Sequence, residues 1–256
     1  MMNASLALTV FTGFFLAMLA SLKGGRRLGR LAFAADRKPA GLVAVETVAF
    51  GLLGLLLALT VSGAADRLDR RRAQIVEEAN AIGTAWLRLD VVSATAQPAL
   101  REQFRRYTDS RLATYRIVSA SGIAAARVEY TRSVALQQEI WTAAVAASRD
   151  APGAAVVLLP ALNAMFDITT TRLAATQMHP PPIVYIVLGL LSLACAFLVG
   201  YEMGASEIAS WPHVVALAFL ISVTLYVILD FEYPRLGLIS IDDFDQFIVQ
   251  VRASMG

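Results

Sequence analysis

Apolar and polar residues follow one another in long blocks along this chain and do not alternate residue by residue. Four apolar blocks approach the roughly 20 residues that a helix needs to cross a bilayer. They are Ser5–Leu22, Leu42–Val61, Ile183–Tyr201 and Val214–Leu229. The polar stretch between the second and third blocks is rich in Ala, Leu, Arg, Glu and Gln and has no period-2 pattern. The pattern predicts two membrane spans, a helical region outside the membrane, two more spans and a tail.

The second apolar block runs without any proline into the polar stretch, from Val43 to Val92. Because proline ends or kinks helices, we expect one helix that leaves the membrane and continues into water. The predicted segments are residues 1–63, with transmembrane helices 1 and 2 and a basic loop; 64–182, a helical extramembrane bundle continuous with helix 2; 183–230, with transmembrane helices 3 and 4; and 231–256, an amphipathic tail. The predicted fold class is all-α, an integral membrane protein with four transmembrane helices and a helical extramembrane bundle.

Prolines, glycines and apolar spacing divide the polar stretch into predicted helices. The first continues from the membrane to Val92, the second starts near Pro98, the third covers Ala125–Ser148 and the fourth runs from Ala155 to Met178. Pro160 either kinks the fourth helix or marks its true start. In the tail, Asp242 is the type of residue that caps a helix N-terminus, and a short amphipathic helix follows it.

Composition supports a membrane protein and argues against an enzyme. Charged residues make up 16% of the chain, whereas a soluble domain carries about 25%. The first block lacks the basic start and the cleavage site of a signal peptide, so we expect it to remain as a helix. The single cysteine, Cys195, and the two histidines, His179 and His213, form no metal-binding pattern. We find no phosphate loop or nucleophile elbow and expect no metal, no cofactor and no enzymatic activity.

Basic residues crowd the predicted loop after the first block. They are Lys23, Arg26, Arg27, Arg30, Arg37 and Lys38, and Asp36 is the acidic residue among them. A basic patch can bind nucleic acid, but beside a membrane span it is more typical of contact with anionic lipid headgroups. We therefore expect membrane lipids, and no nucleic acid, as partners.

Two stretches of the chain carry a family signature. The first is FGLLGLLLALTVSGAADRLDRRRAQIVEEANAIGTAWLRLD, and the second is LDFEYPRLGLISIDDFDQFIVQVRASM. They resemble the bacterial bestrophin-like membrane proteins of unknown function, which are distantly similar to bestrophin channels. The resemblance implies a multi-pass protein of the bacterial inner membrane. It also implies a homo-oligomer, a pentamer by analogy with bestrophins, that conducts inorganic ions through a central pore lined by the second span.

The resemblance assigns the pore-lining positions. Bestrophins line a hydrophobic neck with bulky residues at positions i, i+4 and i+8 of the second span, and the matching residues here are Gly51, Leu55 and Leu59. Leu55 and Leu59 would form apolar rings that gate by dewetting, while Gly51 would leave one ring wide. The alternative is ordinary helix packing, because Gly51 and Gly54 are small residues that let helices approach closely.

Further candidates for selectivity or for a vestibule lie on either side of this neck. A bestrophin Tyr-Asp-Arg element is matched by an alanine followed by Asp66 and Arg67, and Glu78 and Asn80 stand further on. Glu78 and Asn80 either line a vestibule or make hydrogen bonds within the bundle, for which Arg88 and Arg72 are the candidate partners.

Glu46, near the start of the second span, is the remaining candidate. An intramembrane carboxylate is costly, and a ring of such residues selects cations in other channels. Its alternative is an interfacial residue that pairs with Arg37 or Lys38 or favours the helix N-terminus. These features predict a bestrophin-like oligomeric ion channel. The alternative is a non-conducting membrane scaffold or signalling protein whose helical bundle binds a partner.

Overall fold

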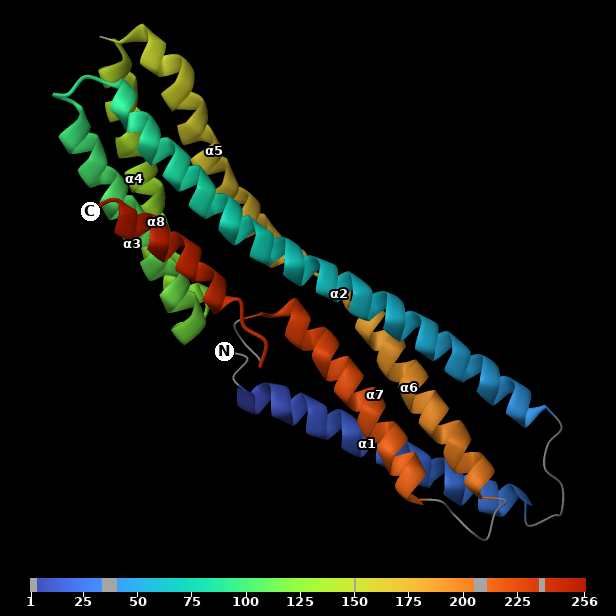
Figure 1. The fold of residues 1–256 in the computed structure, drawn as a ribbon. Coiled ribbons are helices and arrows are strands. Elements are labelled where there is room, and N and C mark those ends of the chain that lie inside the picture. Colours follow the sequence, from blue (N-terminus) through green and yellow to red (C-terminus); the bar gives the residue numbers. More distant parts are fainter. Residues whose placement is uncertain (1–3, 34–40, 150, 205–210, 235–237) are drawn as a thin grey trace. The chain divides into compact units, whose positions relative to one another are not determined.

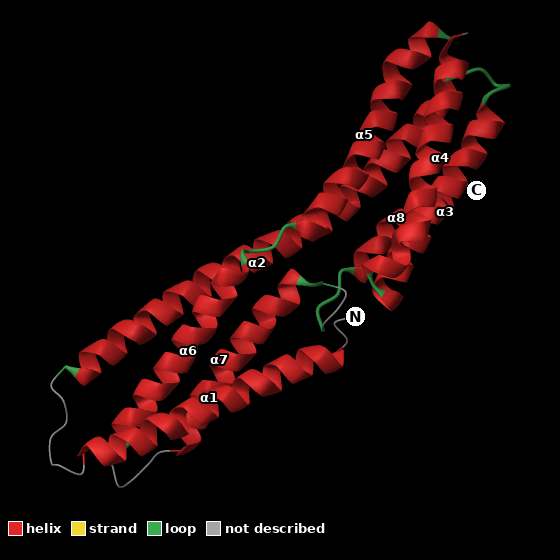
Figure 2. Cartoon of the chain, turned by 180° about the vertical axis from the view of Figure 1, so that it is seen from behind, coloured by secondary structure: helices red, strands yellow, loops and turns green. Residues whose placement is uncertain are grey.

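The structure is a computed structural model that describes residues 4–33, 41–149, 151–204, 211–234 and 238–256. These residues form helices and no strand (Figure 2). They divide into two compact units. The membrane unit extends up to Arg67 and includes His179–Tyr233, and the bundle unit comprises Leu68–Met178 and Pro234–Gly256. The segment boundaries predicted from the sequence concern where the membrane begins and ends, and they stay a prediction.

The prediction of four spans is confirmed, because four helices are long and apolar enough to cross a membrane. They are α1 (Ala4–Phe33), α2 (Leu42–Leu87), α6 (Pro182–Met203) and α7 (Trp211–Glu232) (Figure 1). The helix α2 is continuous over 46 residues and ends in a short 3-10 helix, η1 (Arg88–Val91). The uninterrupted helix that the absence of proline predicts is therefore present.

Helix α1 is longer than its apolar block, because it ends at Phe33 and not at Leu22. The basic residues Lys23, Arg26, Arg27 and Arg30 are therefore helical, and the prediction that they lie in a loop is wrong. Arg37 and Lys38 lie outside the described residues. Glycines at positions 24 and 25 weaken the helical propensity of this stretch, so the extension depends on what α1 packs against.

Glycines bring α1 and α6 into close contact. A Cβ atom at Gly25 would overlap the backbone oxygen of Phe197, and one at Gly29 would overlap that of Tyr201. On the α6 side, a Cβ atom at Gly200 would overlap the backbone oxygen of Leu22 on α1. Helix α1 thus places two contact glycines four residues apart and α6 contributes Gly200, and such small residues let backbones approach within a membrane. This packing explains why α1 stays helical beyond its apolar block.

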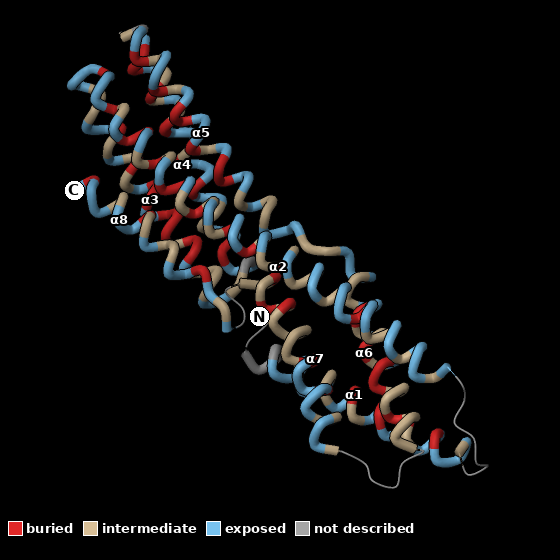
Figure 3. Tube along the Cα trace, turned by 45° about the vertical axis from the view of Figure 1, so that its right-hand side comes forward, coloured by how far each residue is buried: buried red, intermediate tan, exposed pale blue. Residues whose placement is uncertain are grey.

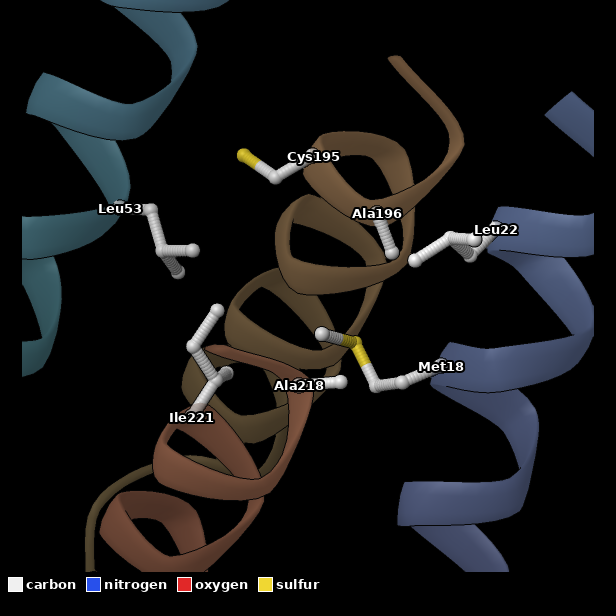
Figure 4. Packing of buried hydrophobic residues seen from close by; sticks show 7 residues of the cluster. All are labelled: Met18, Leu22, Leu53, Cys195, Ala196, Ala218 and Ile221. Atoms are coloured by element: carbon white, nitrogen blue, oxygen red, sulfur yellow. The ribbon is translucent and has the colours of Figure 1, made fainter. Parts of the chain in front are cut away.

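A cluster of buried apolar side chains joins the helices of the membrane unit (Figure 4). Met18 and Leu22 come from α1, Leu53 from α2, Cys195 and Ala196 from α6, and Ala218 and Ile221 from α7. The alanines on α6 and α7 leave room for the longer side chains of α1, which point toward them (Figure 4). The lone cysteine is thus a free, buried core residue.

The bundle unit contains the second half of α2 together with α3 (Gln97–Ser121), α4 (Ile123–Arg149) and α5 (Pro152–Gln177). Helix α3 packs against α4 and against α8 (Gln246–Ser254), and α4 packs against α5. Phe104, Tyr107, Ile140 and Leu162 are fully buried between these helices. Pro160 lies inside α5 and does not mark its start. The carbonyl that it leaves without a helical partner belongs to Val156, an exposed residue.

The tail differs from the prediction at its capping residue. Asp242 does not cap α8, because the short 3-10 helix η2 (Asp242–Asp245) intervenes. Its carboxylate instead accepts a hydrogen bond from the Ser119 hydroxyl of α3 at 2.7 Å. At the other end of α8, Arg105 of α3 donates to the backbone oxygens of Met255 and Gly256. The tail is thus bound to α3 at both ends.

Candidate functional site

The membrane half of α2 is the least covered of the apolar helices. Only 6% of its most apolar stretch is buried within the chain, against 28% for α7. Between Leu42 and Arg67, Leu53 and Ala64 are the buried residues. Figure 3 shows this half of α2 mostly in the exposed and intermediate colours. A span with so little contact inside its own chain presents most of its surface to lipid or to another copy.

Large apolar side chains form a stripe on this uncovered surface. Val45, Val48, Leu52, Leu55 and Leu59 are all exposed and recur at steps of three and four residues. Such a spacing averages 3.5 residues, which is the period of helices that wrap around partner helices. Leu55 and Leu59, the predicted ring residues, belong to this stripe. The residues predicted from the sequence did not include Val45, Val48 and Leu52, although their heptad-like spacing was present in the apolar block.

Gly51 and Gly54, the glycines in the apolar stretch of α2, do not pack within the described chain. A Cβ atom at Gly51 or Gly54 would meet nothing within 4 Å. The small size of Gly51 and Gly54 is therefore not used for contacts within the described chain. Close packing against a second copy and a position beside a pore both remain predictions for this face.

Glu46 lies at the loop end of α2 and faces a second acid. Its carboxyl is within hydrogen-bonding reach of the Glu202 carboxyl of α6. The partners expected for an interfacial Glu46, Arg37 and Lys38, lie outside the described residues. A selectivity ring built from Glu46 stays a prediction, and in this chain it would include Glu202 as a neighbour.

The Asp66–Arg67 pair lies at the opposite end of the membrane unit. Arg67 donates from Nε to Oε1 of Glu232 at 2.7 Å, and the Glu232 side chain is completely buried. Glu232 also lies 3.2 Å from Nδ1 of His179, whose ring stacks on Tyr233. Asp66 is exposed on α2. Arg67 therefore joins α2 to the end of α7.

Glu78 is buried in the bundle unit, where side chains from α3 and α5 surround it. Arg111 donates from Nε to Oε1 of Glu78 at 2.7 Å, and the Tyr115 hydroxyl donates to Oε2 at 2.6 Å. Arg172 forms an ion pair with the same Oε2, and its guanidinium lies 4.1 Å from the centre of the Tyr115 ring. One carboxylate thus holds together three helices of the bundle.

Electrostatics favour the charged form of Glu78. Burial alone raises the pKa of this carboxyl, but the positive charges of Arg111 and Arg172 and the hydrogen bonds from Arg111 and Tyr115 outweigh it. The pKa of Glu78 is lowered from its ordinary value of 4.5 to about 2. The carboxylate is therefore ionised at all physiological pH values.

This burial corrects two expectations. Glu78 cannot line a vestibule, because its side chain has no exposure, whereas Asn80 is exposed. The partners expected within the bundle were also wrong, because Arg88 donates to the backbone oxygen of Val157 and Arg72 pairs with Asp69. Sequence reasoning missed the actual partners, since Arg111 and Arg172 follow Glu78 at separations that carry no local pattern.

Acid should selectively weaken the Glu78 cluster. A carboxylate with a lowered pKa contributes stability that is fully present above about pH 4.5 and is lost as the pH falls toward about 2. We expect the difference in unfolding temperature between the wild type and Glu78→Gln to shrink between about pH 6 and pH 3. Thermal unfolding, monitored by circular dichroism at each pH, measures this difference in unfolding temperature. Glu77→Gln, at an exposed position one residue away, is the control, and a constant difference across this range would contradict the assignment.

The fold and these clusters define a class of protein, a multi-pass helical membrane protein whose second span continues as a helix into a bundle. A family model described as the Bestrophin-like domain matches residues 25–243. The chain therefore belongs to the Bestrophin-like family, which confirms the resemblance seen in its sequence. Comparisons with curated proteins and with solved structures gave no match.

Proposed function

We propose that the chain forms a homo-oligomeric, bestrophin-type ion channel of the bacterial inner membrane, with copies of α2 around a central pore. The observation that supports this proposal is the uncovered apolar stripe on α2. Its residues Leu55 and Leu59 are the positions to which the family resemblance assigns the neck, and their exposed fractions are 57% and 62%. Side chains this exposed on a span need lipid or other copies around them.

The pore follows from symmetry and from the chemistry of the stripe. Copies of one helix arranged around an axis turn the same residue toward that axis in every subunit. Leu55 and Leu59 would then form two stacked apolar rings, which hinder the passage of ions when water leaves the constriction. Gly51 would leave the pore wider one turn before Leu55. We assign the chain a role in transport and no catalytic step.

Ion flux from proteoliposomes tests the neck. Leu55→Ser and Leu59→Ser should each raise the flux roughly tenfold, because a hydroxyl keeps the constriction wet and lowers the barrier by about 1.4 kcal/mol. Leu16→Ser on α1 is the matched control, because Leu16 is an equally exposed apolar residue, at 57%, on another span. An increase in the control of the same size would contradict the assignment of the neck to α2.

Native mass spectrometry of the purified protein in detergent tests the assembly. A pentamer is the expected result, because it supplies the symmetry axis that the pore requires. A monomer or a dimer, together with no flux under any ionic condition, would overturn the channel. The chain would then be the non-conducting scaffold, and its bundle would be the part to test for partners.

A further inference from the structure

The second half of α1 carries three exposed cations on one face. Lys23, Arg27 and Arg30 are all exposed and follow at steps of four and three residues, so they lie on the same side of the helix. With a rise of about 1.5 Å per residue, they span roughly 10 Å along the helix axis. We call these three residues the α1 basic face.

The α1 basic face has no acidic partner within the parts of the chain that the structure describes. Two arginines of the bundle unit differ from them, since Arg101 pairs with Asp90 and Arg252 pairs with Asp109. The acids Glu46 and Glu202 of the membrane unit lie close to one another. Three neighbouring cations without counter-charges favour an anion from outside the described chain.

Aromatic residues place this face at the depth of lipid headgroups. The guanidinium of Arg26, on the same turns of α1, lies 5.2 Å from the centre of the Trp211 ring at the start of α7. The rings of Phe33 and Tyr201 lie 5.1 Å apart, near the ends of α1 and α6. Tryptophan and tyrosine concentrate at the boundary between hydrocarbon and headgroups. The cations therefore lie where lipid phosphates lie.

Apolar neighbours distinguish a lipid from a free anion. Leu28 and Leu31 are 50% and 70% exposed and directly follow Arg27 and Arg30 along α1. A phospholipid offers a phosphate for the cations and an acyl chain for these leucines. The glycine contacts with α6 also hold this part of α1 against a fixed backbone, so the spacing of the cations is set before any lipid binds.

We propose that the α1 basic face is a binding site for the headgroup of an anionic phospholipid, with Leu28 and Leu31 contacting its acyl chain. Arginine supplies a planar fork for two phosphate oxygens, and lysine supplies a point charge. The preference is for lipids with net negative charge, because three cations gain little from a zwitterionic headgroup. The site is independent of conduction, so it can be tested in the absence of flux.

Lipid retention measured by native mass spectrometry tests the site. The protein is reconstituted in nanodiscs that contain equal amounts of phosphatidylglycerol and phosphatidylcholine, and it is then released for analysis. The wild type should retain phosphatidylglycerol in preference to phosphatidylcholine. The triple variant Lys23→Gln, Arg27→Gln, Arg30→Gln should lose roughly a hundredfold in this preference, because each cation near a membrane surface contributes about a factor of five.

The matched control removes the same charge from the bundle unit. Arg127→Gln, Arg132→Gln and Arg149→Gln together should leave the preference unchanged, and the charge-retaining variant Lys23→Arg, Arg27→Lys, Arg30→Lys should keep most of it. Circular dichroism and oligomeric mass show whether each variant is folded. Equal retention of both lipids by the wild type, or unchanged retention by the triple Gln variant, would overturn the proposal. Displacement of the lipid by inorganic phosphate at matched concentration would also overturn it and indicate a free anion as the occupant.

Discussion

Replacing Glu78 with alanine is expected to lower the free energy of unfolding of the bundle unit by about 3–5 kcal/mol. The substitution leaves Arg111 and Arg172 without their counter-ion, and their side chains are only 3% and 10% exposed. Two buried guanidinium groups then repel each other and have lost their shared acceptor. Thermal and urea unfolding of the purified protein, followed by circular dichroism, measure the effect.

Two further variants show that the effect comes from the buried charge. Glu77→Ala changes an exposed neighbour on the same helix and should cost less than about 0.5 kcal/mol. Glu78→Gln keeps the shape of the side chain and an acceptor for the Tyr115 hydroxyl. Its loss of unfolding free energy should therefore lie between the losses in Glu77→Ala and Glu78→Ala. A loss below about 1 kcal/mol in Glu78→Ala would mean that the arginines find water or other acceptors, and the cluster would not hold the bundle together.

Replacing Gly200 with alanine should destabilise the membrane unit by about 2–3 kcal/mol. The new Cβ atom would overlap the backbone oxygen of Leu22, and a backbone atom cannot move aside as a side-chain end can. Helix α1 must therefore separate from α6 along their shared contact. The fraction of protein that stays folded after heating, measured by size-exclusion chromatography in detergent, reports the loss.

The matched control is Gly13→Ala on α1, where a Cβ atom would meet nothing within 4 Å. Alanine favours a helix over glycine by about 1 kcal/mol, so this variant should be neutral or slightly more stable. The two substitutions make the same chemical change, but their expected effects on stability have opposite signs. If Gly200→Ala proved as stable as Gly13→Ala, the close contact between α1 and α6 would be contradicted.

Some features of the candidate site followed from the sequence. The family signature assigned Leu55 and Leu59 to the neck of a pore, and the structure finds both side chains exposed on α2. Their role in a pore stays a prediction, because it depends on the other copies of the chain. The sequence did not reveal the partners of Glu78, because an ion pair between residues far apart along the chain leaves no local spacing.

Sequence alone determined the elements that depend on local composition. A bilayer interior leaves backbone groups without water, so an apolar block of sufficient length must be a helix. The absence of proline from Val43 to Val92 then predicted the continuity of α2, which the structure has. Helical periodicity and Pro98 likewise placed the start of α3.

Only the tertiary structure decided which surfaces meet. The extension of α1 to Phe33 depends on Gly200 and the backbone of α6, which lie far away in the sequence. The role of Asp242 also depends on a residue far away in the sequence. Asp242 accepts a hydrogen bond from Ser119 of α3 and does not cap the helix that follows it. Propensity and periodicity report what a segment favours by itself, whereas a contact depends on the shape and charge of whatever packs beside it. For this reason the sequence predicted the helices, and the packed structure was needed to identify their partners.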